Sequence, residues 1–279
     1  MIQNSYKKNH PQILTHKDTF KISEIFGSAD FVVTEAHRLF TNRCPHRLVP
    51  IVQPGTTTEK LVCGLHGWEW TKEGIPCNNH VPLKSLPTLA IGKSGLLFVD
   101  WQEPHDEQWV DDLSNDQFVY SHSLVKRGTG CMRWQMEMHV DLLHVPHIHR
   151  LLSRHVDVNN LKTSRGDDWI AQYHERGWWL FVYPYTHIEY EPGCLYISEM
   201  RGSNNGGYDV FIHYLFNPSV SELERSRFTH LAETTMDEDI KAVNLLSASS
   251  RYVKPHTTQH PLEVDTTHFY NWLKANGEI

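Results

Sequence analysis

The chain has 279 residues, which is enough for one large domain or two smaller domains with a substantial apolar core. Its net charge of −7, with no cluster of basic residues, argues against nucleic acid as a partner. No apolar run reaches the roughly 18 residues that span a membrane, and the first residues, MIQNSYKKNHPQIL, lack the apolar segment of a signal peptide. We therefore expect a cytoplasmic protein without a membrane or nucleic-acid partner.

Cysteine and histidine are the informative residue types. Five cysteines are too few for a disulfide scaffold in a chain of this length, and paired cysteines in a reducing compartment more often bind metal. The twenty histidines include several clusters, and histidine suits both metal ligation and proton transfer. Cys77, Cys131 and Cys194 stand alone and are interpreted as buried free thiols.

Residues 27–102 contain short apolar runs separated by glycine and proline, which is typical of a small β domain. Residues 103–116 are acidic and polar and make the best candidate boundary. The sequence therefore predicts two domains, residues 1–105, with a core at 27–102, and residues 106–279.

Residues 42–70 hold two Cys–His pairs, Cys44 with His46 and Cys63 with His66. Each pair lies in a short loop with a proline or a glycine, so the loops can bring two thiolates and two imidazoles together. That is the ligand set of a Rieske 2Fe–2S centre, in which two thiolates bind one iron and two imidazoles bind the other. A Cys2His2 zinc site is the alternative, although zinc fingers usually place both cysteines before both histidines.

Residues 134–150, WQMEMHVDLLHVPHIHR, form the next cluster of ligand-type side chains. Two histidines and one carboxylate on one face of an iron make the facial triad of non-heme Fe(II) oxygenases. On a regular helix the spacing of His144 and His147 favours that pair, whereas residues five apart diverge. Pro146 favours a helix that starts near it, and His149 can then turn back toward His144.

The third ligand of such a triad must come from a distant part of the chain. Asp237, Glu238 and Asp239 are the candidates, within a segment that has a helical pattern. Each of them is also consistent with an ordinary solvated charge on a helix, so the residues alone leave the choice open.

The second half of the chain combines strands with helices. Aromatic and β-branched residues favour antiparallel strands at residues 178–190, 194–202 and 208–218. Amphipathic patterns favour helices at residues 220–253 and 267–277. Ser219 or Ser221 is suited to cap the first helix, and Glu222 follows Ser219 with the spacing of a capping box. The predicted class is α+β, with helices covering a sheet.

Two of these motifs resemble a known family. The segment C-P-H-R…C-G-L-H-G-W is similar to the cluster-binding motif of Rieske non-heme iron oxygenases, which include the α-subunits of aromatic ring-hydroxylating dioxygenases. The segment D-L-L-H-V-P-H-I-H is similar to the D-x-x-H-x4-H motif of their catalytic domain. The resemblance extends from about residue 27 to the C-terminus. It implies an N-terminal small all-β Rieske domain and a C-terminal catalytic domain with an antiparallel sheet covered by helices.

The resemblance also implies which residues bind the metals. The ligands of a Rieske 2Fe–2S cluster would be Cys44, His46, Cys63 and His66. The ligands of a mononuclear Fe(II) would be His144, His149 and Asp239, with Asp237 as the alternative carboxylate.

Asp141 is the implied catalytic residue outside the ligand sets. In the family the corresponding carboxylate bridges the iron site of one subunit to the cluster of its neighbour, where its partner here would be His66. His147 remains a candidate pocket residue or alternative iron ligand. Aromatic side chains of the predicted strands are candidates to line the pocket, namely Trp178, Trp179, Phe181, Phe211 and Tyr214.

The function implied by the resemblance is that of a terminal oxygenase component, as in aromatic hydrocarbon catabolism. It would use O2 to hydroxylate, cis-dihydroxylate or oxidatively demethylate a small organic substrate, with aromatic compounds as the expected class. No Gly-x-Gly-x-x-Gly fingerprint follows a strand, so electrons are expected from a separate reductase, with or without a ferredoxin. A head-to-tail homotrimer is expected. The alternatives are a Rieske electron carrier or redox sensor without oxygenase activity, and a zinc-binding interaction module.

Overall fold

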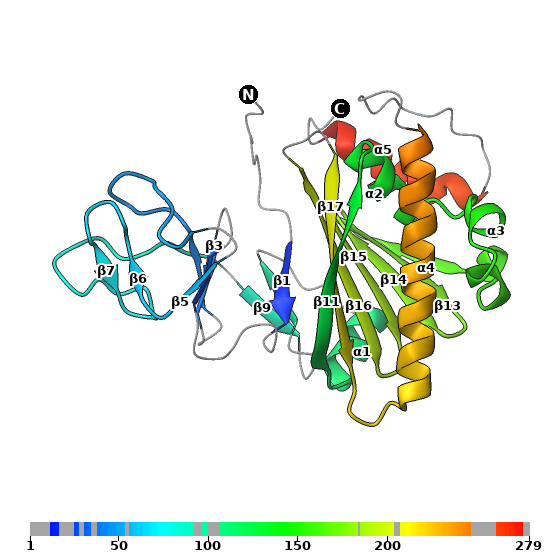
Figure 1. Ribbon diagram of the computed structural model, residues 1–279, viewed down its shortest axis with the longest axis horizontal. Coiled ribbons are helices and arrows are strands. Elements are labelled where there is room, and N and C mark those ends of the chain that lie inside the picture. The colour runs from blue at the N-terminus through cyan, green and yellow to red at the C-terminus, as the bar shows by residue number, and fades with distance from the viewer. Residues whose placement is uncertain are drawn as a thin grey trace. The chain divides into compact units, whose positions relative to one another are not determined.

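The computed structural model describes residues 12–16, 25–27, 31–34, 38–53, 56–86, 88–91, 96–99, 107–183, 185–203, 207–246 and 261–275. The chain divides into two compact units, residues 11–103 and residues 104–279 with residues 1–10. Figure 1 shows short strands in the first unit and helices over a large sheet in the second. The predicted α+β class is confirmed. None of the helices in the described ranges is both long and apolar enough to cross a membrane.

The smaller unit is built from short strands. Their bounds are β1 Gln12–His16, β2 Ile25–Gly27, β3 Phe31–Val33, β4 Leu39–Thr41, β5 Thr56–Thr58, β6 Leu61–Val62, β7 Glu69–Trp70, β8 Ser85–Leu86, β9 Thr88–Ile91 and β10 Leu96–Val99. They form sheets of order β1-β10-β9 and β5-β2-β3-β4-β8, together with the pair β6-β7. Val32, Phe40 and Trp70 are buried in one core with Cys44 and Cys63, so the two cysteines belong to the interior of this unit. Cys77 is exposed, so the prediction of a buried thiol is wrong there.

The larger unit contains one antiparallel sheet of seven strands. Their bounds are β11 Val119–Gly128, β12 Lys162–Arg165, β13 Trp169–His174, β14 Gly177–Val182, β15 Thr186–Glu191, β16 Cys194–Gly202 and β17 Tyr208–Phe216. The order is β11-β17-β16-β15-β14-β13-β12. The stretch predicted as one strand at residues 178–190 therefore forms two neighbouring antiparallel strands. Strands β11, β12 and β13 were not predicted from the sequence.

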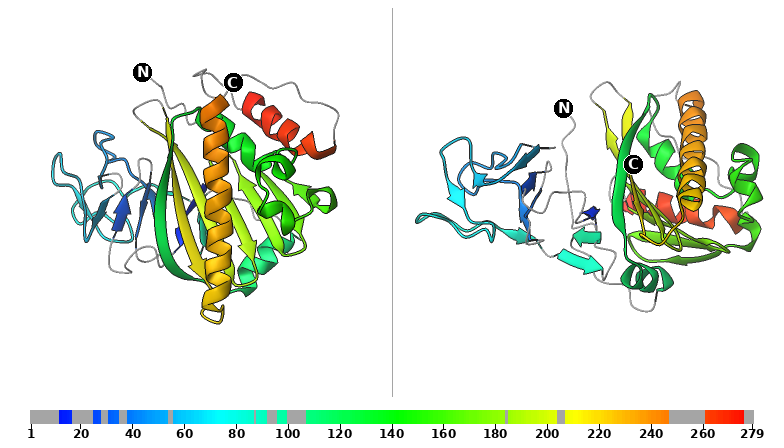
Figure 2. Two further views of the ribbon diagram at one scale, coloured as in Figure 1. Left: turned by 45° about the vertical axis from the view of Figure 1, so that its right-hand side comes forward. Right: turned by 60° about the horizontal axis from the view of Figure 1, so that its bottom comes forward.

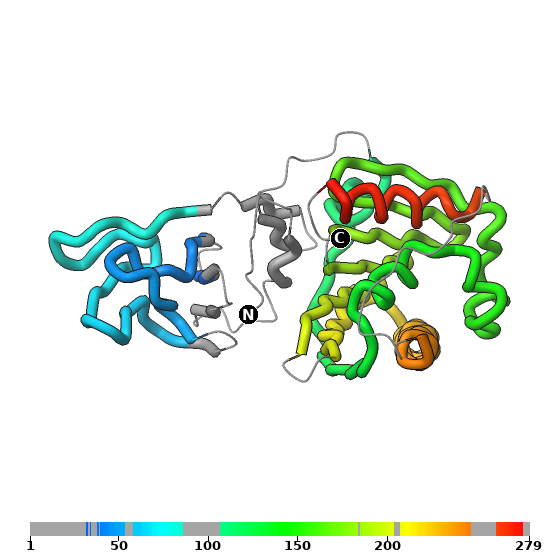
Figure 3. The backbone as a smooth tube through the Cα atoms, turned by 90° about the horizontal axis from the view of Figure 1, so that it is seen from above, coloured from blue at the N-terminus to red at the C-terminus, as the bar shows by residue number. Residues whose placement is uncertain are grey.

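Three helices cover one face of this sheet. They are α2 Met132–Val140, α4 Glu222–Leu246 and α5 Val264–Ala275. Figure 2 shows α4 lying across the strands, and Figure 3 shows the same helix end-on beside them. Met136, Phe228 and Phe269 from the helices are buried together with Tyr196 and Tyr214 from the sheet. The helices thus close the core on one face, as the sequence predicts.

A further helix, α1 Gln108–Asn115, lies in the stretch that the sequence marks only as acidic and polar. Trp109, Val110 and Leu113 are buried on one of its sides. The carboxylate of Asp112 accepts a hydrogen bond from the Trp178 indole at 2.9 Å. One acidic residue of α1 thus makes a structural contact with the sheet.

The start of α4 carries a capping box. The amide of Glu224 lies 3.3 Å from the Ser221 hydroxyl, and the amide of Ser221 lies 3.3 Å from the Glu224 carboxylate. The predicted alternative is wrong, because the Ser219 hydroxyl donates to Asn217 instead, at 2.8 Å. Residues 247–253 of the predicted helix lie outside the described residues.

Replacing Ser221 by alanine should destabilise the protein by about 1 kcal/mol, because the first amides of α4 lose their side-chain acceptor. Ser219→Ala is the matched control, since it removes the same hydroxyl two residues earlier without touching the helix. Equilibrium urea unfolding followed by tryptophan fluorescence would measure both variants. Equal destabilisation of the two would contradict the capping role of Ser221.

Candidate functional site

Two loops with matching hydrogen bonds carry the Cys–His pairs. The amide of Leu48 donates to the carbonyl of Cys44, and the amide of Gly67 donates to the carbonyl of Cys63, both at 2.8 Å. Each cysteine amide also donates to the carbonyl five residues ahead, at 2.9 and 2.8 Å. The residue four places after each cysteine has a positive φ, 58° at Leu48 and 69° at Gly67, which closes both loops tightly.

The loops bury the thiols and expose the imidazoles. Cys44 and Cys63 are 1% and 0% exposed, whereas His46 and His66 lie at the surface with their Nδ1 atoms 3.2 Å apart. The His46 ring stacks on Trp68 with a centroid separation of 4.9 Å and an interplanar angle of 6°. Trp68 thereby fixes the orientation of that imidazole.

These four side chains fit a Rieske cluster. Burial raises the pKa of the Cys44 thiol, and the nearby Cys63 raises it further, whereas backbone N–H groups of His46 and Arg47 lower it. Amide groups directed at a sulfur stabilise the thiolate form, and in such clusters they tune the potential. On the other side, facing lone pairs on two imidazole nitrogens at 3.2 Å would repel unless a proton or a metal lies between them.

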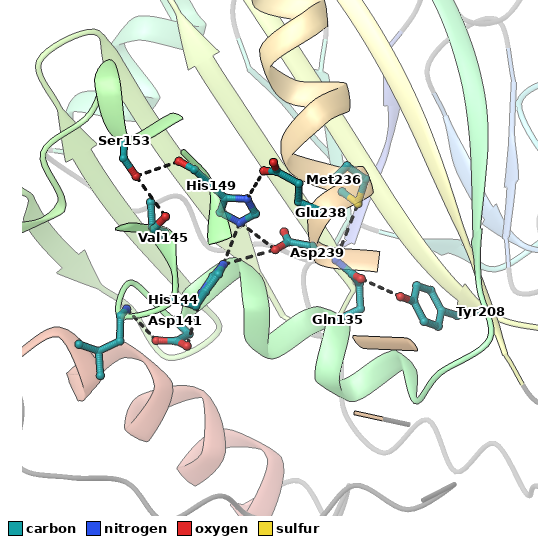
Figure 4. Close-up of polar contacts among 11 residues, drawn as sticks. Gln135, Asp141, His144, Val145, His149, Ser153, Tyr208, Met236, Glu238 and Asp239 are labelled. Carbon is teal, nitrogen blue, oxygen red and sulfur yellow. Dashed lines mark hydrogen bonds and ion pairs between the residues drawn. The ribbon is translucent and has the colours of Figure 1, made fainter. Parts of the chain in front are cut away.

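The two histidines of the second motif flank one helical turn, α3 Val145–Ile148 (Figure 4). Pro146 occupies its first turn, as predicted, because the missing N–H costs nothing there. The His149 amide donates to the Val145 carbonyl at 2.9 Å, and the chain then leaves the helical conformation at His149. The Ser153 hydroxyl lies 3.1 and 2.8 Å from the carbonyls of Val145 and His149, which fixes the turn.

Asp239 approaches these histidines from α4. It is buried on the same side of the helix as Met236, Ile240 and Val243, with 4% of its side chain exposed. Figure 4 shows its carboxylate directed at the facing ring nitrogens of His144 and His149. The helix therefore delivers a distant carboxylate to the short turn.

The three side chains form a compact triangle of donor atoms. The Nε2 atoms of His144 and His149 are 3.0 Å apart, and the Asp239 Oδ1 atom lies 3.3 Å from the first and 2.8 Å from the second. A metal ion with bonds of about 2.1 Å holds ligands at right angles about 3.0 Å apart, so the triangle matches one face of an octahedral ion. Among the described residues, these three make the only group of three or more His, Cys, Asp or Glu side chains whose ligand atoms all lie within 4.8 Å of one another.

Carboxylates behind the histidines complete the arrangement. Glu238 lies 2.9 Å from His149 Nδ1, and Asp141 lies 3.4 Å from His144 Nδ1. Metal-binding histidines typically direct their second nitrogen at such a carboxylate, which fixes the ring and raises its basicity. Both imidazoles therefore present Nε2 to the centre of the triangle.

The electrostatics of the triangle also suit a cation. Burial favours the neutral ring of His144, yet the carboxylates of Asp141 and Asp239 raise its pKa to about 9. Burial alone would raise the pKa of Asp239, but the two imidazoles hold it below its ordinary value. The site thus favours one positive charge at its centre, and a divalent metal would supply it in place of a proton.

Two sequence candidates lie outside the triangle. His147 is exposed on α3 and is not part of the ligand group. Asp237 has 64% of its side chain exposed and forms an ion pair with Lys126 at 2.5 Å. Neither side chain approaches the centre that His144, His149 and Asp239 share.

A pocket adjoins the triangle, and the empty space in and in front of it measures about 510 Å³, open solvent included. It lies between the histidine motif and the sheet, as predicted. Of the five aromatic candidates, its described lining includes Trp179 alone. Trp178 points to the other side of β14, and Phe211 lies under the Arg201 guanidinium at 4.6 Å.

Sequence reasoning assigned no role to three polar residues of the pocket, His139, His187 and Glu189. His139 stacks on His187 with a centroid separation of 4.4 Å, and burial lowers the pKa of His139 to about 4. A signal was present in the segment THIEYE. Polar residues at alternate positions of a strand share one face, and here that face is covered by helices.

Comparisons with known proteins agree with this arrangement. A family model described as Rieske [2Fe-2S] domain matches residues 10–89. No curated protein matches the chain by sequence.

Two solved structures are similar over most of the chain. One is the quaternary ammonium Rieske monooxygenase CntA in complex with L-carnitine, with 12% identity, a TM-score of 0.66, and coverage of 96% of this chain and 88% of that one. The other is dicamba monooxygenase bound to dicamba, with 12% identity, a TM-score of 0.59, and coverage of 97% and 98%. The chain therefore contains a Rieske [2Fe–2S] domain and has the fold of the Rieske non-heme iron oxygenases.

Proposed function

We propose that the chain is the terminal oxygenase component of a Rieske non-heme iron oxygenase system. The observation that carries the proposal is the pocket beside the triangle of His144, His149 and Asp239. An electron carrier needs the Rieske domain alone, whereas this chain adds a second, buried ligand set that opens onto space for a small molecule. The substrate is a small organic compound, with aromatic compounds as the working class.

The proposal assigns the cofactors to the two predicted domains. Residues 1–105 would hold the 2Fe–2S cluster, and residues 106–279 would hold the mononuclear iron. The cluster ligands would be Cys44, His46, Cys63 and His66. The iron ligands would be His144, His149 and Asp239.

The remaining parts of the proposal concern partners. A separate reductase, with or without a ferredoxin, would supply electrons to a cytoplasmic homotrimer. Asp141 would connect the iron site of one subunit to His66 of the next. The partial exposure of Asp141, at 25% of its side chain, supports this role because a neighbouring subunit can reach it.

The chain's own residues supply binding and orientation. When bound, the cluster provides single electrons and the iron provides open positions for O2 beside the substrate. Glu238 and Asp141 hold the imidazoles of His149 and His144 in the orientation that directs Nε2 inward. Apolar pocket residues exclude water from the same space, among them Met138, Leu142, Val145, Leu152 and Leu231.

The similar structures leave the substrate open. One of them is described with L-carnitine and the other with dicamba, which differ in charge and in ring content. At 12% identity these similarities support the fold of the pocket rather than its specificity.

Protein purified without oxygen should contain about three irons and two acid-labile sulfides per chain. The dithionite-reduced sample should give a Rieske-type EPR signal, and O2 uptake should respond to substrate when a reductase is added. About two irons and two sulfides that persist after incubation with Fe(II) would contradict the proposal and favour an electron carrier or redox sensor. Zinc in place of iron would favour the zinc-binding module.

A further inference from the structure

One acidic residue of the pocket takes no part in the ligand set or its supporting carboxylates. Glu189 lies on β15 and lines the pocket with 19% of its side chain exposed. Asp239 binds within the triangle, and Asp141 supports His144. Glu189 therefore needs a separate explanation.

Two aromatic residues flank Glu189 on the sheet. Trp179 of β14 and Tyr196 of β16 are its direct partners in the antiparallel register. Directly opposed residues in such a sheet share one face, with Cβ atoms about 4.5–5.5 Å apart. Trp179 also lines the pocket, and Tyr196 is buried in the adjoining core. Glu189 thus lies between two aromatic residues on the same face of the sheet.

No described side chain of the pocket offers a cation to this carboxylate. Neither lysine nor arginine occurs among its lining residues. The ring nitrogen His187 Nδ1 is 3.8 Å away, beyond hydrogen-bond distance, and burial holds the pKa of His187 well below its ordinary value. Arg176 and Arg227 approach the same strand but pair with Glu191 instead.

An unpaired carboxylate in this position is costly, because burial disfavours its charge. Burial, followed by the negative charges of Glu191 and Asp239, raises the pKa of Glu189 to about 8. A cation placed in the pocket would reverse this penalty. Aromatic faces beside a carboxylate are a suitable environment for an ammonium group, since both attract positive charge.

We propose that Glu189 binds a positively charged nitrogen of the substrate, with Trp179 beside it in the pocket lining. The apolar part of the lining, which includes Met138, Leu142 and Leu231, would hold the carbon skeleton. The substrate class is thus an organic ammonium compound with an apolar body. This inference rests on the proposed oxygenase function and narrows its substrate.

The test compares two soluble isosteres, choline and 3,3-dimethylbutan-1-ol, by isothermal titration calorimetry on the metal-loaded protein. They share shape and hydroxyl group and differ in one positive charge, and a quaternary nitrogen has no lone pair with which to bind metal. Wild-type protein should bind choline at least about tenfold more tightly. Glu189→Gln keeps the shape of the side chain and should abolish this preference.

Glu199→Gln is the matched control, because Glu199 lies on the neighbouring strand β16 and pairs with Arg201 at 2.7 Å, outside the pocket lining. It should keep the preference for choline. Equal binding of the two probes by wild-type protein, or a preference that survives in Glu189→Gln, would overturn the proposal.

Iron and sulfide are measured in the same samples, which separates this inference from the oxygenase proposal. A full iron complement with substrate-dependent O2 uptake, but without charge preference, rejects only the substrate class. A charge preference in protein that never takes up the third iron rejects the oxygenase and leaves the cation site in place.

Discussion

Asp239→Ala should remove the mononuclear iron and leave the cluster's visible absorption unchanged. The wild-type carboxylate is buried, and its Oδ1 atom lies 2.8 Å from His149 Nε2 and 3.3 Å from His144 Nε2. Without it the site keeps two neutral ligands and loses its only negative donor. Loss of an outer-sphere partner already weakens metal binding by roughly 10- to 100-fold, so loss of a ligand should exceed that. Iron and sulfide per chain, with EPR of the reduced cluster, give the measurement.

Asp237→Ala is the matched control, since it removes the same group two residues earlier on α4. Its exposed carboxylate pairs with Lys126, so this variant should retain about one mononuclear iron per chain. Should the alanine variant of Asp239 fail to fold, Asp239→Asn keeps the size of the side chain and removes its charge. A normal iron content in either Asp239 variant, or iron loss in the Asp237 variant, would reject the assignment.

The choice between these neighbouring acids illustrates what the sequence could have resolved. Phe228, Leu231, Met236, Ile240 and Val243 recur at helical spacing and are buried along one side of α4. A residue at position 239 falls within this stripe, whereas one at 237 falls outside it. The apolar pattern therefore predicts that Asp239, rather than Asp237, faces the buried side of α4, although Asp239 was selected from the family resemblance.

The Rieske loops were predictable because their information is local. Each Cys–His pair spans three or four residues, so spacing alone indicates a shared ligand loop. The two loops have the same pattern of backbone hydrogen bonds around Cys44 and Cys63. This was not predictable, because the intervals from cysteine to histidine differ. Leu48 takes the left-handed conformation that glycine adopts at position 67, and its side chain gave no sign of this.

The positions of the polar pocket residues His187 and Glu189 could not be predicted from the sequence. Alternation in residues 186–191 puts His187 and Glu189 on one face of a strand, but it does not tell which face the helices cover. Strand β15 pairs with β14 and β16, and only this pairing places Glu189 between Trp179 and Tyr196. Non-local pairing, rather than local propensity, therefore determines which side chains lie side by side in the pocket.

Asp141→Asn should abolish turnover while both metals stay bound. One carboxylate oxygen of Asp141 accepts a hydrogen bond from the Leu143 amide at 2.9 Å, and the other lies 3.4 Å from His144 Nδ1. Asparagine keeps this shape but cannot offer a charged acceptor to His144 or, in the proposed homotrimer, to His66 of the neighbouring subunit. O2 uptake with a reductase, measured beside iron and sulfide content, should show a loss well beyond the roughly 10- to 100-fold expected for an outer-sphere contact.

Glu238→Gln distinguishes two roles of Asp141: connecting the two metal sites, or only orienting the iron ligand His144. Glu238 contacts His149 Nδ1 at 2.9 Å, as Asp141 approaches His144, and the two carboxylates have similar exposure, 34% and 25%. If Asp141 acts only by orienting an imidazole, the two variants should lose activity to a similar extent. If Asp141 connects the two sites, only its variant should leave a chemically reduced cluster unable to reoxidise during turnover. Retained turnover in Asp141→Asn would remove this residue from the path between the subunits, whatever the Glu238 variant does.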